Sequence, residues 1–244
     1  MRVTSSLLSL FIVGAFSAGS AQANLITNGN FETVTNGTNK QLTAGATTTV
    51  ANRTTLTGWN SAASNTGDGG YNFVLANSLA AGNTSIKQIK NYRTSANGGN
   101  VFSSDAQYGP GALSQTITGL AIGTTYLLSF EWAVGQQAGF SGANLNNYWQ
   151  VNFGSSAANT TAITIADSAF SGWQTASMAF VATSTSQLLS FLAKGGTSGA
   201  PPFLMLDGVS MDAKAVPEPS TISLLLAGAG LVGFTARRRR NRKA

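Results

Sequence analysis

The chain has 244 residues, with 14 Lys and Arg against 8 Asp and Glu, and it contains no cysteine and no histidine. These absences exclude disulfide bonds, Ser-His-Asp and Cys-His catalysis, and the histidine ligands of an ordinary catalytic zinc site. The basic excess belongs to the two ends, because residues 24–215 hold seven Lys and Arg and seven Asp and Glu. A neutral domain without a basic patch gives no electrostatic basis for nucleic-acid binding, so we expect no such partner.

The N-terminus has the three parts of a secretory signal in their expected order. Arg2 is followed by an apolar run over residues 7–16, which is too short to span a bilayer. Ala21-Gln22-Ala23 then provides a small-residue cleavage site. We therefore expect residues 1–23 to be a cleaved signal peptide and the mature chain to begin at Asn24.

The middle of the chain indicates an all-β domain. Short runs rich in Thr, Val and aromatic residues alternate with Gly, Asn and Ser clusters, and no helical period is evident. Residues 125–133 are the clearest strand, with Tyr126, Leu128, Phe130 and Trp132 on one face. Residues 33–57 are expected to form a long loop or weak strands. The pattern predicts a sandwich or barrel with strands near residues 25–27, 71–75, 113–117, 125–133, 148–153, 174–182, 187–193 and 203–211.

The C-terminus contains an apolar stretch followed by a basic block. Residues 220–236 carry no charge and would extend roughly 25 Å as a helix, near the lower limit for a membrane span. Residues 237–243 contain six Lys and Arg and should remain cytoplasmic, which leaves the domain outside the membrane. The sequence thus predicts a single transmembrane helix with an Arg-rich tail within residues 216–244.

Val216, Pro217, Glu218 and Pro219, followed by the apolar span and the Arg cluster, resemble the PEP-CTERM sorting signal. The resemblance implies recognition by an exosortase, with processing near the two prolines, in a Gram-negative bacterium that makes extracellular polysaccharide. It also implies an exported protein at the cell surface or outside the cell. The prolines hold the segment extended, which suits a protease groove, and Glu218 would be a recognition residue.

A second resemblance covers the middle of the chain. The run from Asn24 to Glu32, Asn-Leu-Ile-Thr-Asn-Gly-Asn-Phe-Glu, is similar to the N-terminal motif of galactose-binding-like jelly rolls, which include carbohydrate-binding modules. Later segments match in order, including residues 57–59, 113–117, 123–130, 172–174 and 206–211. The resemblance implies a jelly-roll β-sandwich over residues 24–215, and it leaves function open because this fold has many uses.

The same resemblance implies a structural calcium ion. In such jelly rolls the first and last strands lie close together, and Glu32 and Asp207 occupy the matching acidic positions. Calcium takes six to eight oxygen ligands, many of them backbone carbonyls, so two carboxylates can suffice. The alternative is a turn glutamate and a surface aspartate. Gly208 stands where relatives often carry a second acidic residue.

A glycan site would combine aromatic faces with amide groups. We expect Trp59, Trp132 and Trp173 in the core, and one residue of the Tyr148–Trp149 pair facing inward. The candidates for glycan contact lie in the loops and at a strand start: Tyr92, Tyr108, Phe140, Asn144, Asn146, Asn147, Tyr148 and Trp149.

Three functional classes remain open. The first is a non-catalytic exported surface or matrix protein associated with exopolysaccharide and biofilm, and the second is a carbohydrate-binding module with a defined glycan. The third is a glycoside hydrolase, which needs two carboxylates at a set separation across a cleft. The small number of carboxylates disfavours the hydrolase.

Overall fold

The computed structural model describes residues 24–43, 52–61, 71–77, 89–196, 201–214 and 228. The predicted signal peptide and the residues Val216, Pro217, Glu218 and Pro219 lie outside the described residues, as does the predicted span except Gly228. Within the described part of the chain, no helix is both long enough and apolar enough to cross a membrane.

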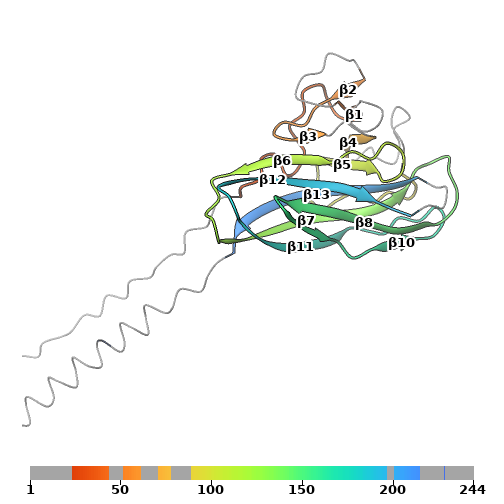
Figure 1. Cartoon of the computed structure of the whole chain (residues 1–244). Helices are drawn as coiled ribbons and strands as arrows, with labels where there is room; N and C mark the ends of the chain where they lie inside the picture. The colour runs from red at the N-terminus through yellow and green to blue at the C-terminus, as the bar shows by residue number, and fades with distance from the viewer. Residues whose placement is uncertain are drawn as a thin grey trace, which may run out of the picture.

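The domain is a jelly-roll β-sandwich, as the sequence predicts, built from two sheets stacked face to face (Figure 1). One sheet has the strand order β11-β7-β13-β5-β4-β1-β2, and the other has β10-β8-β12-β6-β3 with β9 also paired to β8. All neighbouring strands are antiparallel except β1 and β2. The strands are β1 (Lys40–Leu42), β2 (Arg53–Thr54), β3 (Asn60–Ser61), β4 (Asn72–Ala76), β5 (Asn100–Asp105), β6 (Leu113–Thr118), β7 (Thr125–Gln136), β8 (Asn144–Phe153), β9 (Ser156–Asn159), β10 (Ile163–Ile165), β11 (Gln174–Val181), β12 (Ser186–Lys194) and β13 (Pro202–Ala213).

Seven of the eight predicted strands coincide with observed ones, and the exception is residues 25–27. That segment is irregular, although Leu25 N–H donates to Met211 O at 2.9 Å and so lies beside β13. Sequence reasoning also missed β5. Its sequence, Asn-Val-Phe-Ser-Ser-Asp, has no alternation of polar and apolar residues that could reveal a strand, although all six residues are buried.

The core lies between the sheets and is rich in aromatic side chains. In β7 the side chains of Tyr126, Leu128, Phe130 and Trp132 are all buried, which confirms the predicted inward face. Phe191 of β12 meets Phe130 of the opposite sheet edge to face, with ring centroids 5.2 Å apart. Because the chain has no disulfide, this packing has to supply most of the stability.

The N-terminal segment is anchored to the core by a buried ring and by hydrogen bonds. Phe31 is fully buried with a positive φ of 60°, and its ring lies 5.7 Å from Trp59. The side chain of Gln115 accepts from Thr27 N–H and donates to the carbonyls of Thr27 and Gly58. Val209 N–H donates to Gly29 O, so the first described residues lie beside the last strand, as the resemblance implies.

A smaller apolar cluster covers the other face of the seven-stranded sheet. Phe73, Val101, Ala133 and Phe203 come from four neighbouring strands and are buried together with Leu75, Ile89 and Met205. Trp173 is only half-buried and packs against this outer cluster. The prediction of a core position is therefore wrong for Trp173, whereas it is confirmed for Trp59 and Trp132.

Replacing Phe191 with Ala should lower the free energy of unfolding by about 3–5 kcal/mol, because the change removes a buried ring and leaves a cavity. Leu188→Ala is the matched control on the same strand, since Leu188 is 52% exposed and the change should stay within ±0.5 kcal/mol. Urea denaturation of both variants measures the difference. Equal losses would contradict the placement of the core.

Candidate functional site

Three carboxylates surround the segment of residues 95–100, which leads into β5 and includes its first residue. Asp207 of β13 is fully buried, and its register partner across the strands is Glu131 of β7. Glu32 approaches the same segment from the N-terminal side, where its Oε1 accepts from Asn100 N–H at 2.8 Å. The fold thus brings Glu32 and Asp207 to one segment, although 175 positions separate them in the sequence.

Hydrogen-bond donors of the same segment hold the carboxylates. Ser95 Oγ donates to Asp207 Oδ2 at 2.5 Å and lies 3.3 Å from Glu131 Oε2. Asn97 Nδ2 donates to Glu131 Oε2 at 2.9 Å. The other Asp207 oxygen accepts from Gly208 N–H at 2.7 Å, at a point where Gly208 has a positive φ and the β13 register shifts. The bulge therefore aims the Asp207 carboxyl at the 95–100 segment.

The electrostatics of this cluster are unfavourable for charge on Asp207. Burial raises the pKa of Asp207 to about 6, and the charges of Glu131 and Glu32 also raise it, against the lowering effect of the hydrogen bonds from Ser95 and Gly208. Burial and the charge of Asp207 likewise raise the pKa of Tyr92. No Lys or Arg of the described residues is among the groups that shift the Asp207 pKa.

These observations bear on the expected calcium ion. Carboxylate oxygens are suitable ligands, and a cation would relieve the repulsion between Glu131 and Asp207, which stand directly opposite each other. Within the described residues, no group of three or more Asp, Glu, His or Cys side chains is arranged to hold a metal. A calcium ion held by Glu32 and Asp207 would therefore need backbone carbonyls for its other ligands. Glu32 and Asp207 both carry carboxylate oxygens, which are the kind of ligand that calcium takes.

The structure contradicts three of the predicted glycan contacts. Trp149 is fully buried between the sheets, and its indole N–H donates to Met205 O. Asn144 and Asn147 are also buried, and Asn147 Nδ2 donates to the carbonyls of Asn144 and Ile163. These side chains cannot reach a ligand at the surface. The prediction that one residue of the Tyr148–Trp149 pair faces inward is confirmed, since Trp149 is buried and Tyr148 is half-buried.

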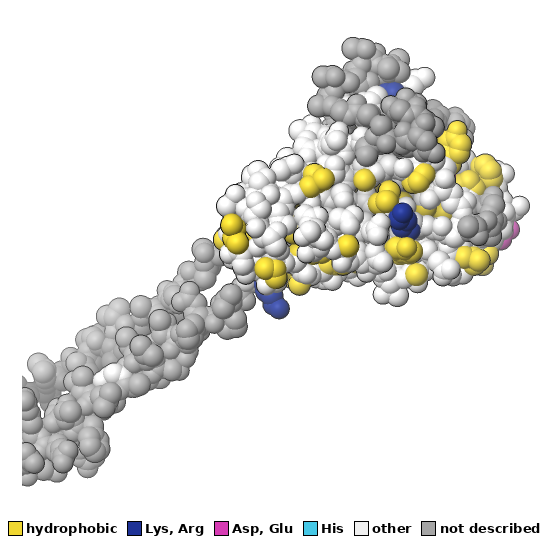
Figure 2. All heavy atoms as spheres, viewed as in Figure 1, with side chains coloured by type: hydrophobic (Ala, Val, Ile, Leu, Met, Phe, Trp, Pro, Cys, Tyr) yellow, Lys and Arg dark blue, Asp and Glu magenta, His cyan; other side chains and the backbone are white. Residues whose placement is uncertain are grey.

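The other candidates do not form one site. Tyr108 and Phe140 are 63% and 41% exposed, and Asn146 is exposed with a positive φ. Tyr108 packs edge-on against Tyr71, and Tyr92 is half-buried, with its hydroxyl donating to Asn77. None of the ring contacts among the described residues joins Tyr108, Phe140 and Tyr148. Figure 2 likewise shows hydrophobic side chains scattered over one face, with few charged groups.

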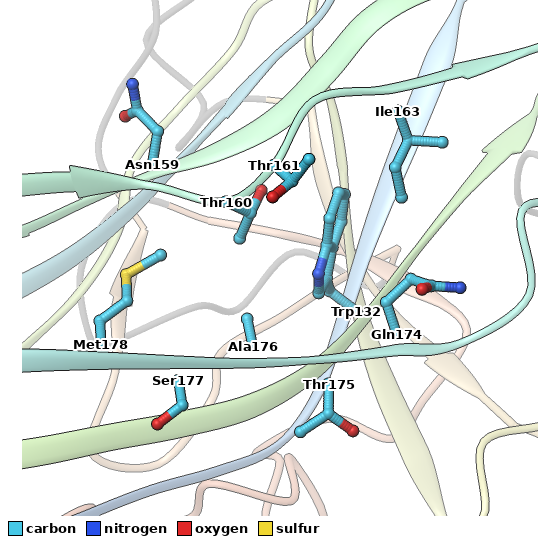
Figure 3. Close-up of a pocket in the computed structure, with 10 residues that line it drawn as sticks. All are labelled: Trp132, Asn159, Thr160, Thr161, Ile163, Gln174, Thr175, Ala176, Ser177 and Met178. Carbon is cyan, nitrogen blue, oxygen red and sulfur yellow. The ribbon is translucent and has the colours of Figure 1, made fainter.

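A groove of about 380 Å³ lies between one edge of the seven-stranded sheet and one edge of the six-stranded sheet. One wall is β11, the edge strand of the seven-stranded sheet, and the other is the chain from β9 to β10 along the edge of the six-stranded sheet. Trp132 stands between the walls (Figure 3). The complete lining is Trp132, Asn159, Thr160, Thr161, Ile163, Gln174, Thr175, Ala176, Ser177 and Met178.

This groove has a neutral lining, with buried residues at its base and exposed polar residues around them. Trp132, Thr160 and Met178 are buried, whereas the hydroxyl and amide side chains of Asn159, Thr161, Gln174, Thr175 and Ser177 are exposed. None of its ten residues is charged. Sequence reasoning correctly placed Trp132 in the core but missed the groove, because its two walls are edge strands of different sheets. Alternation along a strand carries no information about which edges meet.

Residues 215–240 match the family described as the PEP-CTERM protein-sorting motif. The match confirms the sorting signal predicted from Val216, Pro217, Glu218 and Pro219, and it identifies the chain as a protein sorted to the cell surface by the exosortase route. Among curated protein sequences, none matches this chain.

Several solved structures are similar to the chain. TmCBM61 in complex with β-1,4-galactotriose shares 13% identity over 79% of this chain and 99% of that chain, with a TM-score of 0.42. The K2 cleaved adhesin domain of Lys-gingipain shares 13% identity over 80% and 99%, with a TM-score of 0.39. A structure entitled "CBM4 structure and function" shares 16% over 78% and 99%, with a TM-score of 0.33. At these identities and scores, the ligands of those proteins carry no information about what this chain binds.

Proposed function

We propose that this chain is an exported, non-catalytic surface protein, processed by an exosortase in a Gram-negative bacterium and associated with the polysaccharide around the producing cell. The observation that carries the proposal is the sorting motif at residues 215–240, placed behind a neutral all-β domain. A sandwich with few charges and many hydroxyl and amide side chains suits a hydrated neutral polymer better than a charged partner. We place biofilm association in the same proposal.

The carboxylates support a non-catalytic role. A glycoside hydrolase needs an acid and a second carboxylate on either side of a bond in an accessible cleft. Asp207 is fully buried and hydrogen-bonded by Ser95, and the groove between the sheets has no carboxylate in its lining. A carbohydrate-binding module with a defined glycan is the second candidate, and the polar groove favours it.

The sorting step predicts the C-terminus of the mature protein. Because the proline-bounded motif precedes the apolar span, exosortase processing should remove the span and the Arg block. Intact mass of the surface protein should place its last residue between 216 and 220. A matched strain without the exosortase should retain residues 237–240. Recovery of those residues from the wild-type strain would contradict the processing.

Calcium binding by Glu32 and Asp207 predicts a chelator-sensitive stability. A ligand that binds only the folded state stabilises it by about 2.7 kcal/mol at a hundred times its Kd, or roughly 5–10 °C in Tm for a domain of this size. Excess EGTA should lower the Tm of the mature domain, and Glu32→Gln should remove that difference. Asp212→Asn is the control, because Asp212 lies outside the cluster on β13. A Tm that EGTA leaves unchanged would refute the calcium site.

Polysaccharide association predicts weak binding without turnover. Contact with one sugar ring buries roughly 50–100 Å² and contributes only about 1–2.5 kcal/mol before ordering costs, so monovalent affinity should be millimolar or weaker. Many copies on a surface would supply the useful retention. Affinity electrophoresis should show slower migration of the mature domain in the producer's exopolysaccharide, with no reducing ends released. Unchanged migration would refute polysaccharide association, and released ends would refute the non-catalytic role.

A further inference from the structure

One tryptophan differs from the other three in its hydrogen bonding. The indole N–H groups of Trp59, Trp149 and Trp173 donate to the carbonyls of Asn28, Met205 and Arg93. Trp132 has no acceptor for its N–H among the described residues. Its side chain is nevertheless almost entirely buried, with 3% of its surface exposed.

The Trp132 N–H is not sealed inside the protein. Several buried polar atoms lack both a partner and solvent contact, and the indole nitrogen of Trp132 is not one of them. Figure 3 shows the Trp132 ring standing in the groove, with its nitrogen towards the space between Thr160 and Ala176. A buried donor without a protein acceptor is costly unless water or a ligand satisfies it. The groove therefore offers a place where a water or a ligand atom can accept a hydrogen bond from this donor.

The groups around Trp132 extend the same chemistry. Thr160 Oγ1 accepts from the backbone N–H of Trp149 at 3.0 Å, which leaves the hydroxyl proton of Thr160 free to donate. Gln174 of β11 is the register partner of Trp132 of β7, so the two side chains leave the sheet on the same, inner face. Ala176 and Met178 follow on that face and supply apolar surface. The site thus combines a fixed N–H donor, hydroxyl and amide groups, and aliphatic walls.

That combination matches a neutral sugar. A sugar ring presents hydroxyl and ring oxygens that accept from N–H groups, hydroxyl protons that amide and Thr oxygens accept, and C–H surfaces that pack on apolar walls. An anionic residue would find no cation in the lining to pair with. An apolar ligand would leave the Trp132 donor unsatisfied. The groove's volume of about 380 Å³ lies in the range of small-ligand pockets.

We propose that the groove between β11 and the β9–β10 edge is a binding site for a neutral sugar residue of a polysaccharide, with the Trp132 N–H donating to a sugar oxygen. This inference rests on the proposed polysaccharide association and gives that association a location. Binding at the groove leaves the acidic cluster and the outer aromatic side chains, including Tyr108 and Phe140, without a role in glycan contact.

Two kinds of variant test the site. Trp132→Phe keeps an aromatic ring in the core and removes only the donor and part of the indole. Thr161→Ala/Gln174→Ala removes two exposed polar groups and should not affect folding, which keeps the test valid if the first variant unfolds. Thr116→Ala/Gln107→Ala is the matched control, since both residues are exposed and neither lines the groove. Thermal melting verifies that each variant is folded.

The probes are the producer's exopolysaccharide, a neutral galactan, a neutral β-glucan and the anionic polymer alginate, all in affinity electrophoresis. We expect retention by at least one neutral polymer, with the apparent Kd raised about tenfold in the groove variants, which corresponds to ~1.4 kcal/mol, and unchanged in the control. Retention that the groove variants leave intact would overturn the sugar site but not the polysaccharide association. Retention by alginate alone would overturn the neutral specificity of the groove. Absence of retention in every polymer would overturn both proposals.

Discussion

The stability of this domain depends on aromatic packing between its two sheets. Phe191 lies at the centre of this packing. Its ring centroid is 5.2 Å from that of Phe130 in the facing sheet and 6.3 Å from that of Trp149 in its own sheet. Phe102 extends the cluster from Trp149 towards Phe31, which anchors the N-terminal segment. An exported domain with no cysteine cannot use disulfides, so the sheets have to stay together through buried apolar area.

One consequence is the acidic cluster outside the core. The strand pairing that aligns β13 with β7 also places Asp207 opposite Glu131, and the N-terminal segment brings Glu32 to the same loop. Like charges across a strand pair oppose folding. Ser95 and Asn97 donate to these carboxylates and offset part of that cost, and burial raises the pKa of Asp207 nonetheless. The calcium ion proposed at Glu32 and Asp207 would offset the remainder of that cost.

A second consequence is the groove at the sandwich edge. Trp132 belongs to the same inner face as Phe130, but at its position the facing sheet has reached its edge. Its ring is therefore covered on the core side, while none of the described residues accepts a hydrogen bond from its N–H. Trp132 thus packs in the core and also forms the base of a polar groove.

The sequence alone determined the sorting signal, the all-β class and the inward face of β7, because each depends on residue order within one segment. The sorting motif is recognised from the order of its residues, and alternation along residues 125–133 is a local property of a pleated strand. It also indicated that Glu32 and Asp207 approach each other, through motifs at the two ends of the domain. Only the tertiary structure decided that Trp149 is buried and Tyr148 is not, that Glu131 joins the acidic cluster, and that Trp132 borders a groove. These outcomes depend on strand register and on which sheet edges meet, and pairing between distant strands leaves no mark in the local pattern.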